Sequence, residues 1–481
     1  MRYRFSTFFT SSTYLFLLPL FFVLNGLRVN PNVITWGDAL RLFLFYEVAA
    51  VLILLLFRFF FKETNKAALA TFISLAVYLF FGVVHDTLKK FVPISLTKYS
   101  LLLPCLFIAY FCFLLLLKKE IIAKRLLAYL NTLLGILILL ELIMSVQQTF
   151  KQNDKAFSIA AKPGLPKPNV YLIVLDEYAG SAQLEHTFHF RNTIFLDSLL
   201  SLGFAVSKSA TSNYSATPFS IASLLSMSYN DELKNFDYTD QNLNYCYRKI
   251  AQSNVVAGFK SLGYRFVNLS IFDVQGEESQ ISKTFLKAGT ELITAQTLGS
   301  RLKKDLYVNF VSNNLRRTFL YKKMVMEDLH NNELLYQKTV QQARTASLQP
   351  AFIYTHLLMP HFPYYYKSNG VLNDLSVMSP ENLHNMTLYL EYLHYINKRI
   401  LTLLNQILQA DKESVILLLS DHGYRYANDG NFVFSTLFAS YNAKGAMKNN
   451  ASVVTNVNVF RQLFNQLFNT QFPLLPTKNF R

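Results

Sequence analysis

The chain has 481 residues, a formal net charge of +16 and 52% hydrophobic residues. It is too long for one compact core, so we expect two or more units. The positive charge would suit nucleic acid, but the sequence has no basic stripe interleaved with aromatics and no nucleic-acid motif, so we expect no nucleic-acid partner. An excess of Lys and Arg is more typical of a protein that lies close to anionic lipid head groups.

The apolar residues are concentrated before about residue 150. A membrane-spanning helix needs about 20 predominantly apolar residues. Five segments meet this requirement: 6–27, 39–61, 67–88, 99–117 and 125–147. No small-residue cleavage site follows the first segment, so we interpret it as an anchor and not as a signal peptide. The sequence therefore predicts a membrane domain of five transmembrane helices in residues 1–150.

Positive charges in the short loops indicate the orientation of these helices. One side carries Arg2, Arg4, Arg58, Lys62, Lys66, Lys118, Lys119, Lys124 and Arg125. The other side carries fewer: Arg28, Arg41, Lys89, Lys90 and Lys98. The positive-inside rule favours a cytoplasmic N-terminus, and an odd number of spans then places the rest of the chain outside the cytoplasm.

Several ionisable residues lie within or at the edge of the apolar segments. They are Arg41, Glu47, His85, Asp86 and Glu141. Such residues are candidates for function and could meet a lipid head group. The simpler interpretation is that they reach the interface or pair with each other, so we do not assign them to a site.

A polar, Pro-rich stretch, 151–168, is typical of a linker. From Asn169 to residue 481 strand-like runs alternate with helical stretches. The runs are 170–175, 204–207, 264–271, 351–355, 415–419 and 436–440. This alternation predicts one α/β domain, 169–481, with a mainly parallel central sheet flanked by helices.

Two of these strands end in acidic residues. The first is followed by Asp176 and Glu177, and the run at 415–419 continues into Ser420, Asp421, His422 and Gly423. Ligands bind at the carboxyl ends of strands in open α/β sheets, and a carboxylate beside an imidazole can bind a divalent metal. The alternative is that Asp and Gly simply make a turn here.

A hydroxyl group and two histidines complete the candidate site. Thr217 precedes Pro218 in a pattern typical of a helix N-cap, which is sufficient to explain it. Alternatively, a metal-bound Thr217 at a helix N-terminus could attack a phosphorus centre. His356 and His361 follow the strand at 351–355 and could bind an anionic group or shuttle a proton.

Taken in order, the acidic strand end, the hydroxyl residue at a helix start, the His-containing loop and the late Ser-Asp-His-Gly resemble the sulfatase/alkaline phosphatase superfamily. With the N-terminal spans, the whole chain is similar to membrane-bound lipoteichoic acid synthases (phosphoglycerol transferases) and lipid A phosphoethanolamine transferases. The resemblance implies an alkaline phosphatase-like fold. It also implies a multi-pass protein of the bacterial inner membrane with an extracytoplasmic catalytic domain.

The resemblance further implies roles for individual residues. Asp176, Thr217, Asp421 and His422 would bind one divalent ion, Mn or Zn, and Thr217 would also be the nucleophile. His361 and His356 would face the substrate phosphate. The expected reaction moves a phospho-head group, phosphoglycerol or phosphoethanolamine, from a phospholipid to a hydroxyl of an envelope glycan or glycolipid. A hydrolase acting on phosphoesters and a catalytically idle envelope protein remain alternatives.

The sequence departs from these relatives in three ways, which narrow the expected reaction and subfamily. Thr217-Pro-Phe-Ser-Ile221 lacks the Cys/Ser-x-Pro-x-Arg precursor of formylglycine, so we do not expect sulfate-ester hydrolysis. Cys246 is the single cysteine after residue 150 and cannot supply the disulfides usual in lipid A phosphoethanolamine transferases. Finally, Glu177 beside Asp176 could be a second metal ligand or could support the first.

Overall fold

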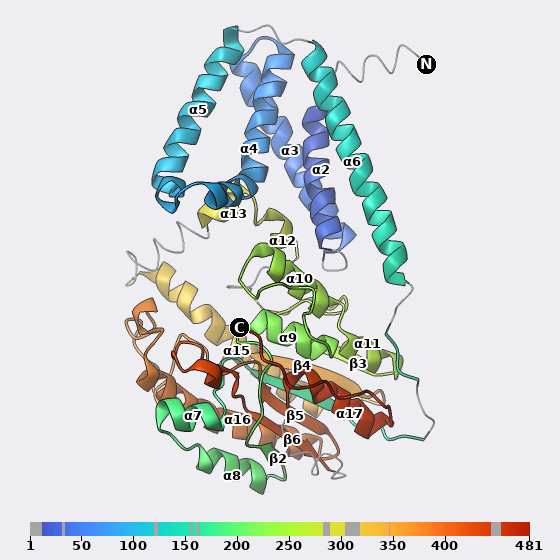
Figure 1. Ribbon diagram of the computed structural model, residues 1–481, viewed down its shortest axis with the longest axis vertical. Coiled ribbons are helices and arrows are strands. Elements are labelled where there is room, and N and C mark those ends of the chain that lie inside the picture. The colour runs from blue at the N-terminus through green and yellow to red at the C-terminus, as the bar shows by residue number, and fades with distance from the viewer. Residues whose placement is uncertain are drawn as a thin grey trace. The chain divides into compact units, whose positions relative to one another are not determined.

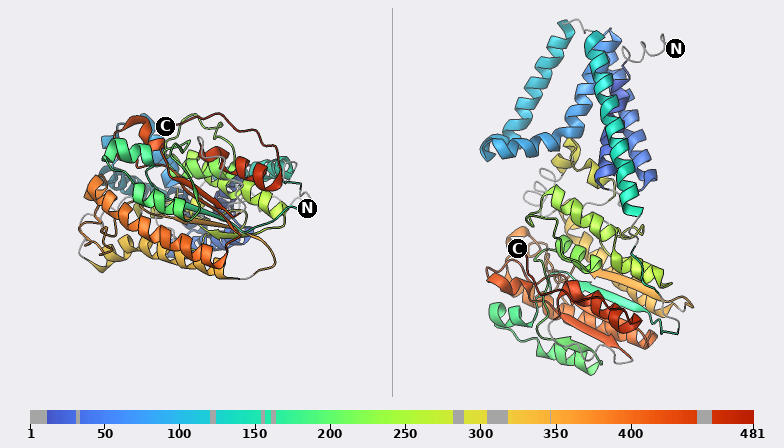
Figure 2. Two further views of the ribbon diagram at one scale, coloured as in Figure 1. Left: turned by 90° about the horizontal axis from the view of Figure 1, so that it is seen from below. Right: turned by 45° about the vertical axis from the view of Figure 1, so that its right-hand side comes forward.

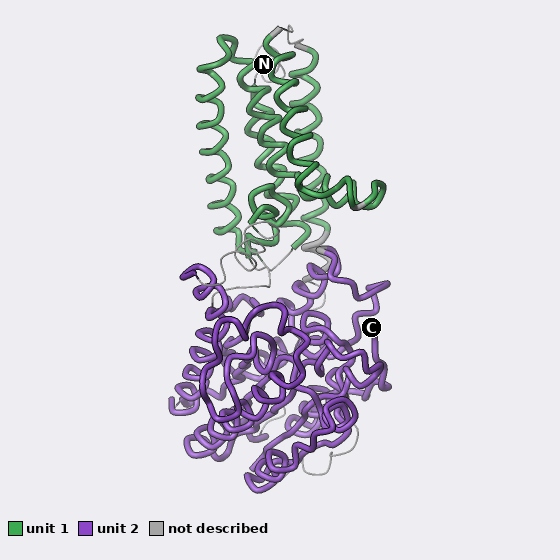
Figure 3. The backbone as a smooth tube through the Cα atoms, turned by 90° about the vertical axis from the view of Figure 1, so that its left-hand side faces the viewer, with its two compact units in different colours: residues 1–155, 287–310 green, residues 156–286, 311–481 purple. Residues whose placement is uncertain are grey.

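The computed structural model describes residues 12–30, 34–119, 124–153, 157–160, 164–281, 289–303, 318–345, 347–443 and 454–481. The chain forms two compact units (Figure 3): unit 1 comprises residues 1–155 and 287–310, and unit 2 comprises 156–286 and 311–481. Unit 1 thus takes a stretch, 287–310, from within the range expected to form the α/β domain. The expected boundaries at 150 and 168 stay predictions.

Unit 1 contains the N-terminal helices. They are α2 (Tyr14–Val29), α3 (Trp36–Phe60), α4 (Thr64–Phe91), α5 (Tyr99–Lys119) and α6 (Lys124–Asn153), with a short 3₁₀ helix η1 (Ile94–Thr97) before α5. Among the described residues, α3 to α6 are long and apolar enough to cross a membrane, whereas α2 is apolar but shorter. The first predicted span began at residue 6, so part of it lies outside the described residues. The protein is therefore a membrane protein, with four strongly apolar helices and a fifth, shorter one.

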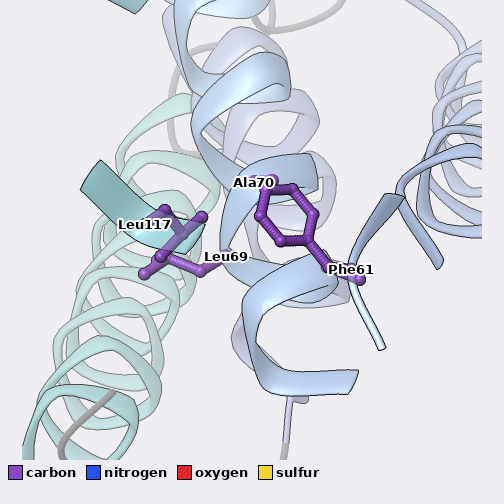
Figure 4. Close-up of a cluster of buried hydrophobic side chains, with 5 residues drawn as sticks. Phe61, Leu69, Ala70 and Leu117 are labelled. Atoms are coloured by element: carbon purple, nitrogen blue, oxygen red, sulfur yellow. The ribbon is translucent and has the colours of Figure 1, made fainter. Parts of the chain in front are cut away.

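The helices of unit 1 pack through small residues. At one end of the bundle Ala67, Leu69 and Ala70 of α4 form a buried cluster with Phe61 and Leu117 (Figure 4). Small side chains let helices approach closely, which is the main source of packing energy where lipid replaces water. Long apolar side chains on the outer surfaces stay exposed, as expected for helices that face lipid.

Two short helices from the distant stretch, α12 (Glu291–Thr294) and α13 (Leu298–Leu302), belong to this unit. α12 packs against α2, and α13 packs against α4. In the turn between them, the Gln296 carbonyl accepts from the backbone N–H of Gly82 in α4 at 2.7 Å. A Cβ at Gly82 would lie 2.3 Å from Gln296 Oε1 and 2.8 Å from Arg301 Nε. Arg301 forms a two-pronged ion pair with Asp86, with N···O distances of 3.1 and 2.5 Å. Glycine is thus required where α13 and the turn before it meet α4.

Unit 2 is built on a six-stranded sheet (Figure 1). The strands are β1 (Val170–Leu175), β2 (Ala205–Ser207), β3 (Arg265–Leu269), β4 (Ala351–Leu357), β5 (Val415–Ser420) and β6 (Phe438–Asn442). Their order is β2-β6-β5-β1-β4-β3, and β6 runs antiparallel to both of its neighbours. The remaining pairs are parallel. The predicted, mainly parallel sheet is confirmed.

Helices cover both faces of the sheet (Figure 2). One face carries α8 (Thr193–Ser201), α15 (Phe319–Arg344) and α16 (Met386–Ala410); the other carries α9 (Thr217–Ser226), α11 (Asn254–Ser261) and α17 (Val459–Phe468). Two further helices, α7 (Ser181–Phe188) and α10 (Asp240–Ala251), lie in the connections. Every residue of β1, β4 and β5 is buried, because a central parallel strand has apolar layers on both sides.

Candidate active site

The register of the sheet brings the two acidic strand ends together. Leu175 of β1 pairs with Ser420 of β5, so the next residues, Asp176 and Asp421, leave adjacent strands at the same edge. Both aspartates are buried, with at most 1% of their surface exposed. The convergence predicted from the sequence therefore occurs.

Asp421 is held by hydrogen bonds that use one of its carboxylate oxygens. Its Oδ1 accepts from the backbone N–H groups of Glu177 (3.0 Å) and His422 (2.8 Å). Its backbone carbonyl accepts from Ser220 Oγ at 2.6 Å and Asn456 Nδ2 at 3.2 Å. Its Oδ2 is buried and, within the described part of the chain, has no hydrogen-bond partner.

His422 has a defined tautomer. Its Nδ1 lies 2.7 Å from the Gly423 carbonyl, which can only accept, so Nδ1 carries the proton. Nε2 then carries a lone pair and lies 3.5 Å from Asp421 Oδ2 and 3.7 Å from Asp176 Oδ1. Burial lowers the pKa of His422 to about 4, against the opposing effect of Asp421. A neutral imidazole of this tautomer is suited to bind a metal through Nε2.

Gly423 supports this geometry by close packing. The sequence suggested that it permits a sharp turn, but its φ is not positive. Instead, a Cβ there would lie 2.4 Å from Gln183 Oε1 and 2.7 Å from the carbonyl oxygens of Val433 and Ser435. The glycine is required because neighbouring backbone passes directly beside it.

Thr217 lies at the N-terminus of α9, facing the aspartates. The capping interpretation is wrong: Ala216 is the N-cap and Thr217 is the first helical residue, followed by Pro218. Its hydroxyl oxygen lies 3.3 Å from His422 Nε2 and 3.5 Å from Asp176 Oδ1. The side chain is buried but free of any capping role, in the positive field of a helix N-terminus.

His356 lies deeper in the sheet than the sequence suggested. It is within β4, fully buried, with Nδ1 2.9 Å from the Tyr354 hydroxyl. Its Nε2 has no hydrogen-bond partner among the described residues, and burial lowers its pKa to about 4. Ligand atoms of Asp176, His356 and Asp421 all lie within 4.8 Å of one another. The structure thus groups His356 with the carboxylates, and its assignment to substrate binding stays a prediction.

His361 lies next to an arginine that the sequence analysis missed. Arg425 Nη2 donates to His361 Nε2 at 2.7 Å. His361 Nδ1 therefore carries the proton and donates to the Phe362 carbonyl at 2.5 Å. The sequence signal for this residue is an arginine two residues after the Asp-His-Gly motif, close to the predicted metal ligands.

Glu177 links Arg425 to the acidic edge. Its Oε1 accepts from the Arg425 backbone N–H at 3.1 Å and lies 3.5 Å from Arg425 Nε, and Oε2 lies 3.8 Å from His361 Nε2. Its φ of 63° is rare for a residue with a side chain. The Tyr389 hydroxyl stabilises this turn by donating to the Glu177 carbonyl at 2.9 Å. In this arrangement Glu177 supports Arg425 and His361 and lies beside the centre.

The charges at this edge favour a cation. Burial and the neighbouring Asp421 raise the pKa of Asp176 well above its usual value. Burial opposes ionisation of Asp421 as well, but His422, His356 and the Glu177 N–H together lower its pKa. The Oδ2 atoms of both aspartates lack partners in the described part of the chain. Because two buried, unpaired carboxylates are costly, these residues fit a divalent cation held by carboxylate and imidazole ligands.

Fold and site together define the class. A parallel sheet that brings two carboxylates, an imidazole and a hydroxyl to its carboxyl edge is typical of enzymes that act on phosphate or sulfate esters. The chain belongs to the sulfatase family, whose sequence model, described as Sulfatase, matches residues 168–457. The resemblance to the sulfatase/alkaline phosphatase superfamily is confirmed, and the protein is an enzyme of this ester-directed class.

Solved structures with a similar arrangement include transferases and hydrolases. The C-terminal periplasmic domain of EptC from Escherichia coli is 13% identical, with 64% of this chain and 84% of that chain covered and a TM-score of 0.40. The periplasmic domain of phosphoethanolamine transferase EptC from Campylobacter jejuni is 16% identical (67% and 100% covered, TM-score 0.36). Phosphonate monoester hydrolase from Agrobacterium radiobacter is 13% identical (63% and 74% covered, TM-score 0.37). A comparison with curated proteins gave no match.

Three of the ionisable residues singled out in unit 1 pair with protein groups, whereas the buried Glu47 Oε1 has no hydrogen-bond partner among the described residues. Glu141 forms an ion pair with Arg28 and Asp86 with Arg301, and Arg41 lies 3.4 Å from Asp38. These contacts agree with the simpler interpretation of the intramembrane charges.

Proposed function

We propose that the protein transfers a phospho-head group, phosphoglycerol or phosphoethanolamine, from a phospholipid to a hydroxyl of an envelope glycan or glycolipid. The observation that carries the proposal is the position of Thr217. Its hydroxyl lies at a helix N-terminus but does not cap the helix, and it is within 3.5 Å of both Asp176 and His422. A hydroxyl nucleophile needs a neighbouring group that lowers its pKa, and this cluster can provide one.

In the proposed site Asp176, Asp421, His422 and the Thr217 oxygen hold one divalent ion, Mn or Zn, and His356 is close enough to join them. The bound cation would lower the pKa of the Thr217 hydroxyl and neutralise charge on the phosphoryl group. The attack, the stabilisation of charge on the substrate and the transfer of protons would be carried out by side chains of the protein.

The reaction proceeds in two displacements. Thr217 Oγ1 loses its proton and attacks phosphorus, the bond from phosphorus to the diacylglycerol oxygen breaks, and that oxygen takes up a proton. The acceptor hydroxyl then loses its proton and attacks phosphorus, the bond from phosphorus to Thr217 Oγ1 breaks, and Thr217 Oγ1 takes up a proton. Arg425 and His361, whose side chains are hydrogen-bonded to each other, would stabilise the non-bridging oxygens.

The cellular setting is part of the same proposal. A phospholipid donor and an envelope acceptor require unit 2 to face the outer side of the bacterial inner membrane. The charge distribution of the short loops supports this orientation.

The test is a transfer assay with the full-length protein in detergent. Phosphatidylglycerol or phosphatidylethanolamine is supplied with Mn or Zn, and release of diacylglycerol is followed with and without a glycan acceptor. We expect release that accelerates with acceptor, and a loss of at least 100-fold in Thr217→Ala. Full activity in Thr217→Ala would refute the nucleophile, and release to water alone would identify a hydrolase.

A further inference from the structure

A cavity of about 240 Å³ opens next to Thr217 in unit 2. Its walls come from the residues that precede and begin α9, from the stretch before α10, from Arg425 and from the last described residues. The lining includes Tyr214, Phe219, Phe236, Tyr238, Arg425 and Phe480. The cavity therefore lies beside the start of α9, where the candidate nucleophile is, and is bounded by the arginine that contacts His361.

The aromatic walls of the cavity are fixed by mutual packing. The rings of Tyr214 and Phe480 stack at 5.0 Å, and Phe219 meets Phe236 edge-on at 5.7 Å and Tyr238 edge-on at 6.0 Å. Phe480 is also held by its backbone N–H, which donates to the Asn213 carbonyl at 2.8 Å. A rigid pocket of this kind selects by shape and by its few polar groups.

Arg425 supplies the polar wall. Its Nη1 donates to the Tyr238 hydroxyl at 3.0 Å and its Nη2 to His361. These bonds use two of the five N–H groups of a guanidinium. The Nε atom is buried and makes no hydrogen bond within the described residues, although Glu177 lies 3.5 Å away. Arg425 can therefore donate to further oxygen atoms.

The size of the cavity suits a head group. At roughly 30 Å³ for each water-sized group, 240 Å³ holds about eight such groups. Glycerol has six non-hydrogen atoms, whereas the diacylglycerol part of a phospholipid is many times larger. The part of the donor that fits is thus the part that would be transferred.

The charge of the lining discriminates between head groups. Arg425 and Arg481 both line the cavity, and its described lining contains no Asp or Glu. Aromatic rings alone would also attract an ammonium group. Glu177 partly balances the charge of Arg425, but Arg481 adds a second guanidinium group, so the lining as a whole repels an ammonium group. The hydroxyl oxygens of a glycerol can accept from Arg425 and from Tyr238.

We propose that this cavity binds the transferred head group and selects one that carries hydroxyls and no ammonium, as in phosphatidylglycerol. The role of the cavity in transfer rests on the proposed function. Its preference between head groups, however, can be measured as binding, without any reaction. Tyr238 is the position to change, because its side chain is half exposed and its hydroxyl pairs with Arg425. A carboxylate there would neutralise Arg425 and offer a partner to an ammonium group.

The experiment is calorimetric titration of the full-length protein in detergent with Mn, using glycerol phosphate and phosphoethanolamine as probes. We expect the wild type to bind glycerol phosphate at least tenfold more tightly. Tyr238→Glu should reduce that ratio at least fivefold, and the matched, uncharged Tyr238→Gln, whose amide can still donate to a hydroxyl oxygen, should reduce it clearly less.

Equal binding of the two probes, tighter binding of phosphoethanolamine or binding of neither would overturn the inference. So would the same change of ratio in both Tyr238 variants. Failure of the proposed function is recognised separately, because it appears as absent diacylglycerol release from either phospholipid.

Discussion

At the scale of residues, the site is defined by buried polar atoms that the protein itself leaves without partners. Asp176 Oδ2, Asp421 Oδ2 and His356 Nε2 are all of this kind within the described chain. Leaving a buried polar group unpaired costs about 1–3 kcal/mol, and more if it is charged. Ligand atoms of these three residues lie within 4.8 Å of one another, so the group could hold a divalent cation.

Asp421→Asn tests this requirement. The substitution keeps an oxygen for the Glu177 and His422 N–H groups but replaces a charged ligand atom with a neutral amide. We expect metal content, measured by mass spectrometry of the purified full-length protein, to fall from stoichiometric to trace. The control is Asp411→Asn, because this carboxylate lies outside the candidate metal site and accepts a hydrogen bond from Asn169 Nδ2 at 2.8 Å. Retention of metal by both variants would contradict the assignment.

At the scale of elements, glycines mark the places where backbones touch. Gly423 lies against the backbone of Val433 and Ser435 in unit 2. In unit 1 Gly82 of α4 lies against Gln296 and Arg301. In both cases the missing side chain allows a separate segment to approach, so we expect these positions to reject even a methyl group.

Gly82→Ala should loosen α13 and the turn before it from α4. The added Cβ would lie within 3 Å of Gln296 Cα as well as of two side chains, so side-chain movement alone cannot relieve the clash. Overpacking of this kind costs about 1–3 kcal/mol. We expect limited proteolysis within 289–303 to become several-fold faster. The matched control is Gly135→Ala in α6, where a Cβ meets nothing within 4 Å; equal protection in the two variants would contradict the contact.

At the scale of the whole molecule, the sequence predicted the positions of the strands better than the roles of the residues at their ends. Each predicted strand occurs, because buried parallel strands are continuous apolar runs with polar ends. Asp176, Asp421 and His422 could be placed together for the same reason. The roles assigned to these residues by resemblance remain predictions.

Other features depend on tertiary contacts that have no local signal. His356 faces the carboxylates only because β4 lies directly beside β1. Arg425 meets His361 through a loop after a different strand, so neither sequence stretch indicates the other. Likewise, nothing in 287–310 is apolar enough to show that it joins the membrane unit.

Metal removal should affect the stability of the protein as a whole. A ligand present at 100 times its Kd stabilises the folded state by about 2.7 kcal/mol. We therefore expect a chelator to lower the Tm of the wild-type protein by several degrees, and added Mn or Zn to restore it. The Tm of Asp421→Asn should not respond. An equal response of the two proteins to chelator would show that the cation binds elsewhere.

The most direct test of the central claim is to detect the phospho-threonine itself. Full-length protein is mixed with phosphatidylglycerol or phosphatidylethanolamine and Mn or Zn, stopped rapidly in acid, and examined by intact-mass and peptide mass spectrometry beside Thr217→Ala. The account predicts an added phosphoglycerol or phosphoethanolamine mass on the peptide that contains Thr217, and no such adduct in the variant. An adduct on another residue, or undiminished diacylglycerol release by Thr217→Ala, would contradict it.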